Sequence, residues 1–503
     1  MPNKIKITQY YNLTAILFCV FILIISLILG YTHVIGNFGV ETDFYGVYAI
    51  QAKNILSGKP YTYLHNPPGY PILLAVFSFL TGDFFVSAKI LTSISTALLG
   101  LICYLIFKSF FTARIALVSV IFLSIILIPF SFLASTDIVG ASFASIPILI
   151  LINKDGINFR TYIIIGIACG VAYLIRADSV FVIIGISFSI LFILISNTWR
   201  EKLIKIGVLL IGFILITSPW FIYNWKLNGS PFATTAYRQV GLYFYDEKGN
   251  ENEHLIKKAS EENSTSPYLL FINPTKLIWK YFKNIPSRIE LLAESGSPFP
   301  LYLFLGGGFF FFLQDLNRKR LAYLIIWLSG FLILGFIAFS FRHYYSLVPF
   351  ISFLIVYSLF NERFFINTGK TKYLIWCIVI LLAVFLSKNS YDKTKDFLDS
   401  EPRYLLDISD FLKKHSSKND IIVARKPHLA YLSNLKKVFL FENSAEDFLY
   451  KSRLINARYI VYSDFEATLW PGLKALSNPD SLPKGYILIY YHKPTNTLIY
   501  EIK

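Results

Sequence analysis

The sequence predicts a polytopic α-helical membrane protein with a small α/β domain at its C-terminal end. Apolar residues make up 55% of the chain, and most of them occur in blocks of about twenty, the length that a helix needs to cross about 30 Å of hydrocarbon. Lysine and arginine residues concentrate in the short breaks between these blocks. Beyond about residue 390 the blocks end, and short runs of β-branched and aromatic residues alternate with helix-like stretches.

The apolar blocks predict about eleven transmembrane helices. The expected spans are 12–31, 86–107, 115–134, 138–152, 161–177, 180–197, 204–223, 299–313, 321–340, 344–360 and 373–388. The first block is longer than the apolar core of a signal peptide, so we expect an uncleaved span. The apolar run 71–80 is too short to cross, and we expect it to lie at the interface or to re-enter the membrane.

The distribution of positive charge predicts the orientation of these spans. A formal charge of +16 is compatible with nucleic-acid binding, but the cations form no basic stripe and instead occupy alternate short loops. Loops rich in lysine and arginine are expected on the cytoplasmic side. Their cations are Lys4, Lys6, Lys108, Arg114, Lys154, Arg160, Arg200, Lys202, Lys205, Arg318, Lys319, Arg320, Arg363, Lys370 and Lys372. We therefore expect the N-terminus inside, and the segments 32–85, 224–298 and the tail outside.

Two domains are expected, a membrane domain at 1–389 and an extracytoplasmic α/β domain at 390–503. In the second domain, β-branched and aromatic runs alternate with a helical pattern, which is typical of parallel strands joined by helices. The expected strands are 421–424, 438–441 and 459–462, the expected helix is 445–455, and 486–491 with 497–502 form a terminal hairpin.

The first outer segment carries the residues most typical of a ligand site. Glu41 and Asp43 lie shortly after the first span, Tyr48 follows them, and His65 precedes the turn Pro67-Pro68-Gly69-Tyr70-Pro71. A lone acidic residue in such a loop is more often a solvated surface charge. The aromatic surroundings favour a binding site, because a tyrosine offers a polar ligand both a stacking face and a hydroxyl.

Further charged residues are predicted at the outer ends of later spans. They are Asp137, Arg176, Arg342 and His343. Structural alternatives exist: Asp137 could cap a helix, Arg176 could pair locally with Asp178, and Arg342 could snorkel to the headgroups. The predicted topology puts all of them on the same face as the first outer segment. Acids that accept a proton and cations that hold phosphate, gathered at a membrane surface, suit chemistry on a lipid-linked phosphate.

An ordered set of motifs extends over nearly the whole chain. They are Glu41-x-Asp43; Tyr48, Ala52 and Asn54-Ile55-Leu56-x-Gly58-x-Pro60-Tyr61; Asn66-Pro67-Pro68-Gly69-Tyr70-Pro71; Thr136-Asp137; Gly170-x-Ala172-x-Leu174-x-Arg176; Pro219-Trp220 with Asn224, Gly229 and Pro231-Phe232; Arg342-His343-Tyr344 with Pro349; and Arg425-Lys426-Pro427. This set resembles the C-type (GT-C) glycosyltransferases, polytopic enzymes that use polyprenyl-phosphate sugars. In pattern it is similar to bacterial relatives of the protein mannosyltransferases and of the lipid A aminoarabinose transferase.

The resemblance implies a GT-C membrane domain and an inverting glycosyltransferase. By its match, Asp43 is implied as the general base that deprotonates an acceptor hydroxyl, with Glu41 and Asp137 as further catalytic carboxylates, of which Asp137 could orient the acceptor. Arg342, and with it Arg176 and His65, would stabilise the departing phosphate. The full set of implied substrate-binding residues is Tyr48, His65, Arg176, Arg342, His343 and Tyr344. A divalent cation held by Asp43 and Asp137 is left open, because some members of the family use a metal and others do not.

The implied partners are a polyprenyl-phosphate-linked sugar donor, membrane lipids, and a glycan, lipid or protein acceptor, with no nucleic acid. The implied location is the cytoplasmic membrane of a prokaryote. Two rival functions stay open: a flippase or transporter of lipid-linked glycan, and a glycan ligase or polymerase that uses diphosphate-linked donors. A transporter is expected to carry ionisable residues near span midpoints, whereas here they cluster at one face.

Overall fold

The computed structural model describes residues 2–153, 158–194, 198–235, 273–296, 307–314, 316–337, 340–360, 369–442, 444–478 and 482–503. By its internal contacts the chain separates into two compact units. Unit 1 contains Met1–Thr32 and Gln51–Asp396, and unit 2 contains His33–Ile50 and Phe397–Lys503. Unit 2 thus combines the tail of the chain with the segment that carries Glu41 and Asp43.

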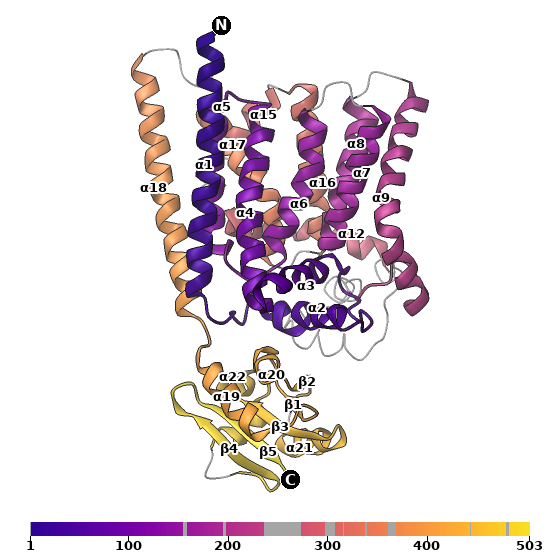
Figure 1. The fold of residues 1–503 in the computed structure, drawn as a ribbon, viewed down its shortest axis with the longest axis vertical. Coiled ribbons are helices and arrows are strands. Elements are labelled where there is room, and N and C mark those ends of the chain that lie inside the picture. Colours follow the sequence, from indigo (N-terminus) through magenta and orange to yellow (C-terminus); the bar gives the residue numbers. More distant parts are fainter. Residues whose placement is uncertain are drawn as a thin grey trace. The chain divides into compact units, whose positions relative to one another are not determined.

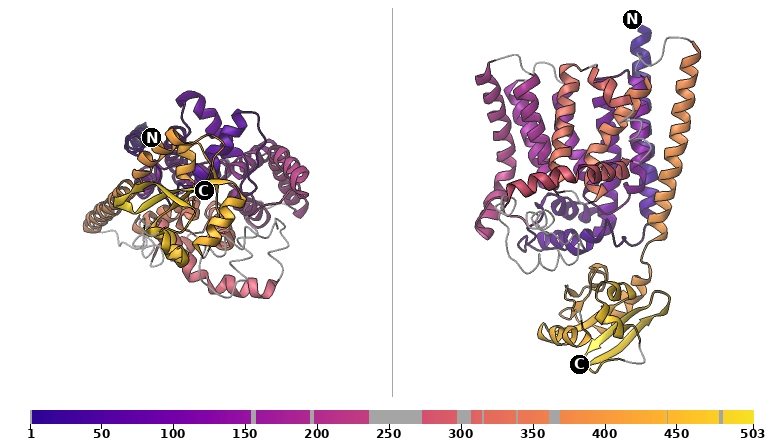
Figure 2. Two further views of the ribbon diagram at one scale, coloured as in Figure 1. Left: turned by 90° about the horizontal axis from the view of Figure 1, so that it is seen from below. Right: turned by 180° about the vertical axis from the view of Figure 1, so that it is seen from behind.

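Unit 1 is a bundle of helices (Figure 1). Its longer helices are α1 (Pro2–Thr32), α4 (Phe84–Lys108), α5 (Ala113–Leu127), α6 (Asp137–Asn153), α7 (Phe159–Ile175), α8 (Val180–Ser189), α9 (Trp199–Asn228), α16 (Arg318–Ile337), α17 (Val348–Phe360) and α18 (Gly369–Asp399). The shorter elements are α2 (Ala49–Leu56), α3 (Gly69–Thr81), η2 (Ile128–Phe130), η3 (Ala177–Ser179), η4 (Ile190–Leu194), α12 (Pro274–Lys283), α13 (Ile285–Gly296), α15 (Phe309–Gln314) and η7 (Phe341–Leu347). The long helices run side by side, whereas α12 and α13 lie across them (Figure 2).

Within the described residues, seven helices are long and apolar enough to cross a membrane. They are Thr8–Thr32, Phe84–Lys108, Ala113–Phe130, Trp199–Asn228, Arg318–Phe336, Phe341–Phe360 and Tyr373–His415, and the shorter apolar helices are Gly69–Thr81, Asp137–Asn153, Phe159–Ile175 and Ala177–Ile193. The chain is a multi-pass membrane protein, as predicted. The expected span 299–313 lies mostly outside the described residues, as does most of the outer segment 224–298, so the number of about eleven spans stays a prediction.

Polar side chains cap the N-termini of several bundle helices and help to fix the residue at which each helix begins. Asp83 accepts a hydrogen bond from the Val86 amide at 2.8 Å before α4, and Asn158 accepts one from the Thr161 amide at 3.0 Å before α7. These bonds satisfy amides that have no partner within the helix. At the other end, Gly229 stops α9 in the left-handed conformation (φ 71°) that a glycine adopts without strain.

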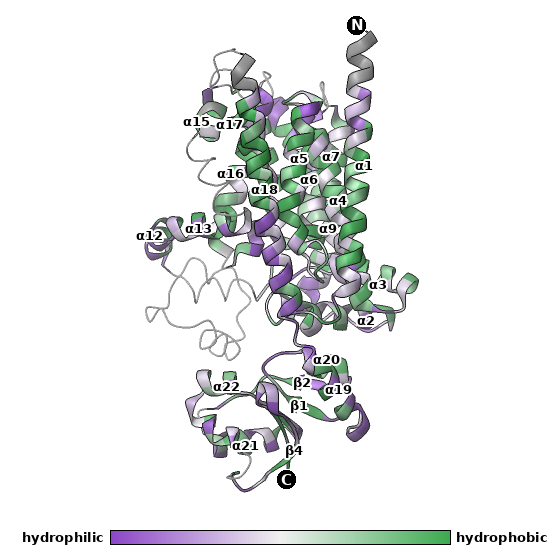
Figure 3. Ribbon diagram, turned by 90° about the vertical axis from the view of Figure 1, so that its left-hand side faces the viewer, coloured by the Kyte–Doolittle hydropathy of each residue, from purple (hydrophilic) through white to green (hydrophobic). Residues whose placement is uncertain are grey.

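The helices of unit 1 differ in how much of their apolar surface is covered. In the most apolar stretch of each segment, 28% of the residues of the α1 segment and 22% of those of the α9 and α18 segments are buried, whereas 78% of those of the Phe341–Phe360 segment are buried. Figure 3 shows that hydrophobic residues run along the bundle helices, while hydrophilic and hydrophobic residues mix in the tail. Extensive uncovered apolar helix surface suits a lipid environment, since hydrocarbon imposes no cost on it.

Unit 2 contains a mixed sheet with the strand order β2-β1-β3-β5-β4. The strands are β1 (Ile421–Val423), β2 (Lys436–Val438), β3 (Ala457–Tyr462), β4 (Tyr486–His492) and β5 (Thr497–Ile502). β1 is parallel to β2 and β3, whereas β5 pairs antiparallel with β3 and β4. The connecting elements are α19 (Tyr404–His415), α20 (His428–Ser433), α21 (Ala445–Leu454), α22 (Asp464–Leu469), η8 (Pro471–Ser477) and η10 (Lys493–Thr495).

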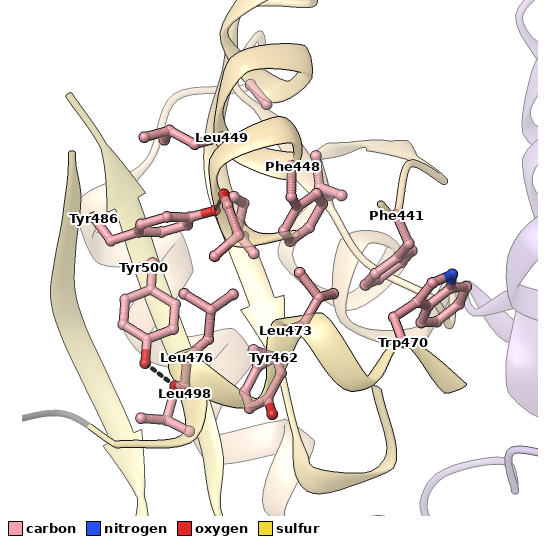
Figure 4. Packing of buried hydrophobic residues seen from close by; sticks show 14 residues of the cluster. Phe441, Phe448, Leu449, Tyr462, Trp470, Leu473, Leu476, Tyr486, Leu498 and Tyr500 are labelled. Atoms are coloured by element: carbon pink, nitrogen blue, oxygen red, sulfur yellow. Dashed lines mark hydrogen bonds between the residues drawn. The ribbon is translucent and has the colours of Figure 1, made fainter. Parts of the chain in front are cut away.

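The structure confirms the predicted α/β character of the tail, including the parallel strands and the terminal hairpin. The prediction of one strand is wrong, because β2 ends at Val438 and does not run through 438–441. The reason is that Phe441 is buried by packing and not by strand pairing, while Phe439 is 37% exposed. Phe441 stacks on Trp470 with ring centroids 4.5 Å apart, and Figure 4 shows both rings in the hydrophobic core of the unit.

Buried tyrosine hydroxyls complete this core. The Tyr486 hydroxyl donates to the carbonyl oxygen of Ala445 at 2.6 Å, and the Tyr500 hydroxyl donates to the carbonyl oxygen of Leu476 (Figure 4). A buried hydroxyl without a partner would be costly, so these bonds fix where α21 and η8 lie on the sheet.

Candidate active site

A polar group in unit 1 surrounds Arg176; we call it the arginine cluster (Thr136, Asp137, Arg176, Asp178 and His343). Nε of Arg176 donates to both carboxylate oxygens of Asp178, at 2.9 and 2.7 Å. Nη1 donates to Thr136 Oγ1 at 2.9 Å and also to Asp137 Oδ1. Nη2 donates to Nδ1 of His343 at 2.9 Å. The structure therefore brings together three residues that the sequence singled out, Asp137, Arg176 and His343.

Four elements position the arginine cluster. α7 ends just before Arg176, α6 begins at Asp137, η3 carries Asp178 and η7 carries His343, and α6 packs against both α7 and η7. Position 140 in α6 requires glycine, because a Cβ there would lie 2.7 Å from Cδ of Arg176. The close approach of α6 to this side chain thus depends on a residue without a Cβ.

The Pro-Pro-Gly-Tyr-Pro turn also lies next to the end of α7. A Cβ on Gly69 would lie 2.5 Å from the carbonyl oxygen of Leu174, which is two residues before Arg176. A glycine at this point therefore lets the start of α3 touch the backbone of α7. The apolar run 71–80 belongs to α3, a helix of 13 residues, which is too short to cross about 30 Å of hydrocarbon.

Two buried polar atoms beside the arginine cluster have no hydrogen-bond partner among the described residues. They are Oδ2 of Asp137 and the hydroxyl of Tyr345, whose residues are 4% and 1% exposed. The hydroxyl of Tyr345 interacts electrostatically with the charged groups of Asp137, Glu294 and Arg342. Because a buried polar atom without a hydrogen-bond partner is costly, these two atoms are candidates for hydrogen bonds to a ligand.

The other substrate contacts expected in unit 1 have different surroundings. Arg342 is half-buried in η7. Tyr344 is completely buried, with its ring centroid 6.5 Å from that of Phe331, so it packs inside the bundle. Nδ1 of His65 lies 3.1 Å from Oγ1 of Thr235, which places His65 against the segment that follows α9.

The acidic residues of the first outer segment lie in unit 2 and differ from each other in burial. Asp43 is half-buried just before η1 (Phe44–Tyr48), and Tyr48 is buried within η1. Glu41 is 0% exposed. Its two carboxylate oxygens lie 3.0 and 2.9 Å from Nε2 of His33, and Oε2 also accepts a hydrogen bond from the Asn37 amide at 2.9 Å.

The other nitrogen of His33 faces a second carboxylate. Nδ1 lies 2.6 Å from Oε1 of Glu401, a residue that follows α18. We call His33, Glu41 and Glu401 the histidine cluster. Burial alone would lower the pKa of His33, but the attraction of Glu41 and the hydrogen bonds to Glu401 and Glu41 outweigh burial and raise this pKa to about 9. His33 is therefore positively charged at neutral pH.

Comparison with known proteins adds evidence on the family. A profile of the dolichyl-phosphate-mannose-protein mannosyltransferase family matches residues 65–223, which is less than half of the chain. A search of curated protein sequences finds no significant match. Among solved structures, ArnT from Cupriavidus metallidurans bound to undecaprenyl phosphate matches with 12% identity over 96% of this chain and 97% of that chain, at a TM-score of 0.61.

A second group of solved structures comes from an archaeon. The oligosaccharyltransferase AglB from Archaeoglobus fulgidus, in complex with an inhibitory peptide and a dolichol-phosphate, matches with 13% identity over 98% of this chain and 74% of that chain, at a TM-score of 0.60. A complex of the same enzyme with Zn and sulfate matches with 13% identity over 95% and 72% of the two chains, at a TM-score of 0.59. Both ArnT and AglB are GT-C glycosyltransferases.

The chain has the GT-C fold. The resemblance inferred from the ordered motifs is confirmed, and the comparisons agree with the predicted class of enzyme. The match to the family profile begins at His65 and ends within α9, so it includes the Pro-Pro-Gly-Tyr-Pro turn, Asp137 and Arg176.

The described residues of this GT-C chain do not form a metal site by themselves. No group of three or more His, Cys, Asp or Glu side chains among them is arranged to hold a metal ion. The unpartnered Oδ2 of Asp137 offers one oxygen ligand, and Mg²⁺ commonly takes one or two carboxylates together with waters and substrate phosphates. The divalent cation therefore stays an open prediction.

Sequence reasoning did not identify His33, Glu401 or Tyr345 as site residues. A signal for the first two was present, because His33 follows the first span, Glu401 follows the last one, and the predicted topology puts both outside. Ions of opposite sign at two such span ends can pair. No signal distinguishes Tyr345 from its neighbour Tyr344, since only packing decides that the hydroxyl of Tyr345 lies near Asp137.

Proposed function

We propose that this protein transfers a sugar from a polyprenyl-phosphate donor to an acceptor hydroxyl, with inversion at the sugar carbon, on the outer face of a prokaryotic cytoplasmic membrane. The observation that carries the proposal is Asp137, whose buried Oδ2 lacks a partner among the described residues while Arg176 holds Oδ1. A carboxylate fixed in this way in a GT-C bundle is prepared to accept a hydrogen bond from a sugar or acceptor hydroxyl. The undecaprenyl phosphate and dolichol-phosphate in the ArnT and AglB complexes support a prenyl-phosphate donor.

The chemical step that we propose is a single displacement. Asp43 takes the proton of the acceptor hydroxyl, and the oxygen attacks the anomeric carbon. The bond from this carbon to the phosphate oxygen breaks, and the prenyl phosphate leaves with the bonding electrons. Because phosphate is a good leaving group, no protein acid is needed. Asp43 is half-buried, so its carboxylate is not sealed in the protein interior as Glu41 is.

The two arginines receive different roles in this proposal. Every nitrogen of the Arg176 guanidinium already donates to a protein acceptor in the arginine cluster. Arg176 is therefore assigned to positioning Asp137 and His343. Arg342, half-buried and adjacent in sequence to His343, is assigned to the developing charge of the phosphate. Tyr345 and Asp137 are assigned to hydroxyl groups of the substrates.

The first test is Asp43→Asn, which keeps the shape of the side chain but removes its ability to accept a proton. Loss of a general base typically reduces the rate on the order of 10²–10⁴-fold, while donor binding should survive because the amide repels no phosphate. The assay uses purified protein in liposomes with labelled undecaprenyl-phosphate hexoses and a cell-envelope lipid and glycan extract as acceptor. It measures the release of undecaprenyl phosphate, and donor binding is measured separately.

The control is Asp410→Asn, which makes the same chemical change at an exposed carboxylate of α19 that pairs only with Lys413 among the ion pairs of the described residues. It should retain wild-type activity. Equal activity of Asp43→Asn and wild type would exclude Asp43 as the base. Turnover of diphosphate-linked oligosaccharides but of no monophosphate-linked sugar would instead favour the ligase function, for which the similarity to AglB is the specific support.

A further inference from the structure

The histidine cluster joins segments that are more than three hundred residues apart in the sequence. His33 lies directly after the first apolar block, and Glu401 lies directly after α18. His33 and Glu41 are both 0% exposed, and Glu401 is 8% exposed. Such burial of three ionisable side chains is unusual unless the charges compensate each other.

The geometry of this cluster requires a doubly protonated ring. A neutral imidazole has one N–H donor, so one of its nitrogens would direct a lone pair at a carboxylate. Here Nε2 faces Glu41 and Nδ1 faces Glu401, at 2.9 and 2.6 Å. With both carboxyl groups ionised, both contacts are favourable only when His33 is an imidazolium, which donates to each carboxylate in a charge-assisted hydrogen bond.

The charged groups around the cluster come from several segments of unit 2. Nε of Arg403 lies 2.8 Å from the second oxygen of Glu401, and this arginine side chain is 61% exposed. Lys426 and His428 approach from the turn after β1 and from α20. The Lys426 ammonium donates to the carbonyl oxygen of Phe38 at 2.9 Å, so it holds the backbone of the loop between His33 and Glu41.

Hydrogen bonds extend from the cluster along the backbone of residues 33–50, which we call the acidic loop. Besides its amide bond to Glu41, Asn37 donates through Nδ2 to the carbonyl oxygen of Phe397 at 3.0 Å, and its own carbonyl oxygen accepts from Nε2 of His428 at 3.2 Å. The ring of Tyr45 lies 4.4 Å from that of His428 and its hydroxyl accepts from the Gly36 amide at 2.9 Å. The loop is thus held on both sides of Asp43.

We propose that His33 and Glu401 are positioning residues, which clamp the acidic loop onto the C-terminal domain and so set the place of Asp43. The part of this proposal that concerns catalysis rests on the proposed function of Asp43; the clamp itself does not. Glu41 belongs to the clamp and not to the reacting groups, since its carboxylate is buried and bound to His33 and to the loop backbone. The C-terminal domain therefore contributes to turnover through the place of Asp43.

The clamp carries a defined dependence on pH. The pKa of His33 is raised from 6.5 to about 9 in the folded protein. A group whose pKa is raised by folding stabilises the fold fully below its ordinary pKa and loses this effect as the pH rises through the folded value. The acidic loop should therefore be ordered below about pH 6.5 and should loosen as the pH passes through about 9.

The test compares Glu401→Gln, Glu401→Ala and the matched control Asp410→Asn with wild type, all as full-length protein in detergent. Hydrogen–deuterium exchange of the peptide that covers 33–50 is measured between about pH 6 and about pH 10, a range that brackets both pKa values of His33, and is corrected for the intrinsic exchange rate. The turnover number and the Michaelis constant for an undecaprenyl-phosphate hexose are measured over the same range. The amide oxygen that Glu401→Gln introduces would still accept from Nδ1 of His33, so this variant is expected to fold.

Loss of a charge-assisted hydrogen bond should raise the exchange of the acidic loop about tenfold or more, most in Glu401→Ala, less in Glu401→Gln, and not at all in Asp410→Asn. Removing one carboxylate also lowers the pKa of His33, so the loosening in Glu401→Gln should begin at lower pH than in wild type. The turnover number should fall over the same pH range in which the exchange rises, while the Michaelis constant for the donor stays unchanged. Arg342, the proposed contact of the donor phosphate, belongs to unit 1.

Two outcomes would overturn the clamp. Hydrogen–deuterium exchange in Glu401→Gln could equal that of wild type at every pH, or its rise with pH could begin at the same pH as in wild type. Increased exchange with unchanged turnover would overturn the positioning role and leave only a structural one. If wild type itself transfers no sugar while the exchange results appear as expected, the proposed function fails and the clamp stands.

Discussion

Two buried polar clusters, one in each unit, use similar chemistry in different ways. In the histidine cluster of unit 2, both nitrogens of His33 donate to carboxylates, and Glu41 and Glu401 receive further donors from the Asn37 amide and Arg403. In the arginine cluster of unit 1, each guanidinium nitrogen of Arg176 donates to a protein acceptor, but Oδ2 of Asp137 has no hydrogen-bond partner among the described residues. The first cluster is closed, whereas the second is open at one oxygen.

The difference teaches how burial can be interpreted. A buried charge whose partners are all protein groups fixes the structure, because every donor and acceptor that it offers is already used. A buried carboxylate that keeps one oxygen unused carries a cost that a bound ligand removes. On this basis we assign the buried acid Glu41 to the structure and the buried acid Asp137 to the site, although the sequence had grouped them.

Two histidines in unit 2 show the same dependence on partners. Burial lowers the pKa of both, yet the carboxylates beside His33 raise its pKa to about 9, whereas the backbone carbonyl beside His428 leaves the pKa of that residue lowered to about 4. His33 is thus an ion and His428 a neutral ring. The identity of the neighbour, and not the degree of burial, decides the charge.

The largest expected effect concerns membrane topology, because a reporter fused to the chain lies either inside or outside the cytoplasm. Both clusters take part in one reaction only if their segments are on the same side of the membrane. A reporter fused after Lys503 should be active outside the cytoplasm, and one fused after Arg320 should be active inside. If both fusions report the same side, one of the expected spans 321–340, 344–360 and 373–388 does not cross the membrane.

The next largest effect is expected for Arg342→Ala. Removal of a group that stabilises developing negative charge typically reduces turnover about 10²–10³-fold. Expression and insertion should be normal, because Arg342 is half-buried and not sealed in the core. Steady-state kinetics with an undecaprenyl-phosphate hexose measure the effect, and a conservative Arg342→Lys should recover part of it. Full activity of Arg342→Ala would leave snorkelling to the headgroups as the role of this residue.

The smallest effects sharpen the distinction between the closed and the open cluster. Asp137→Asn should lower turnover about tenfold or more, the scale of a charge-assisted hydrogen bond. Its melting temperature should fall less than that of Glu41→Gln, because the Arg176 side chain is 12% exposed whereas that of His33 is 0% exposed. Glu41→Gln should lower the melting temperature by a few degrees, since the buried His33 loses a charged partner. Both measurements are made on both variants by thermal unfolding in detergent and by donor turnover. The opposite assignment of effects would show that the closed cluster contains the reacting acid.

Much of this organisation could be predicted from the sequence because it depends on local patterns. Blocks of about twenty apolar residues are sufficient to predict membrane helices, and the alternation of short strands with a helix in the tail is sufficient to predict its α/β sheet. The pairing of Arg176 with Asp178 was also predictable, because the two residues are separated by a single position. The order of the motifs along the chain predicted the GT-C fold.

The sequence by itself determined the class of the protein, the helical blocks, the hairpin and the acidic loop as a region of interest. Only the tertiary structure decided which acid is bound and which is open, since His33 meets Glu401 and Arg176 meets His343 across long stretches of chain. It also decided that residues 33–50 belong with the tail. The physical reason is that hydropathy and helix length are properties of neighbouring residues, whereas hydrogen bonds between buried charges depend on how distant elements pack.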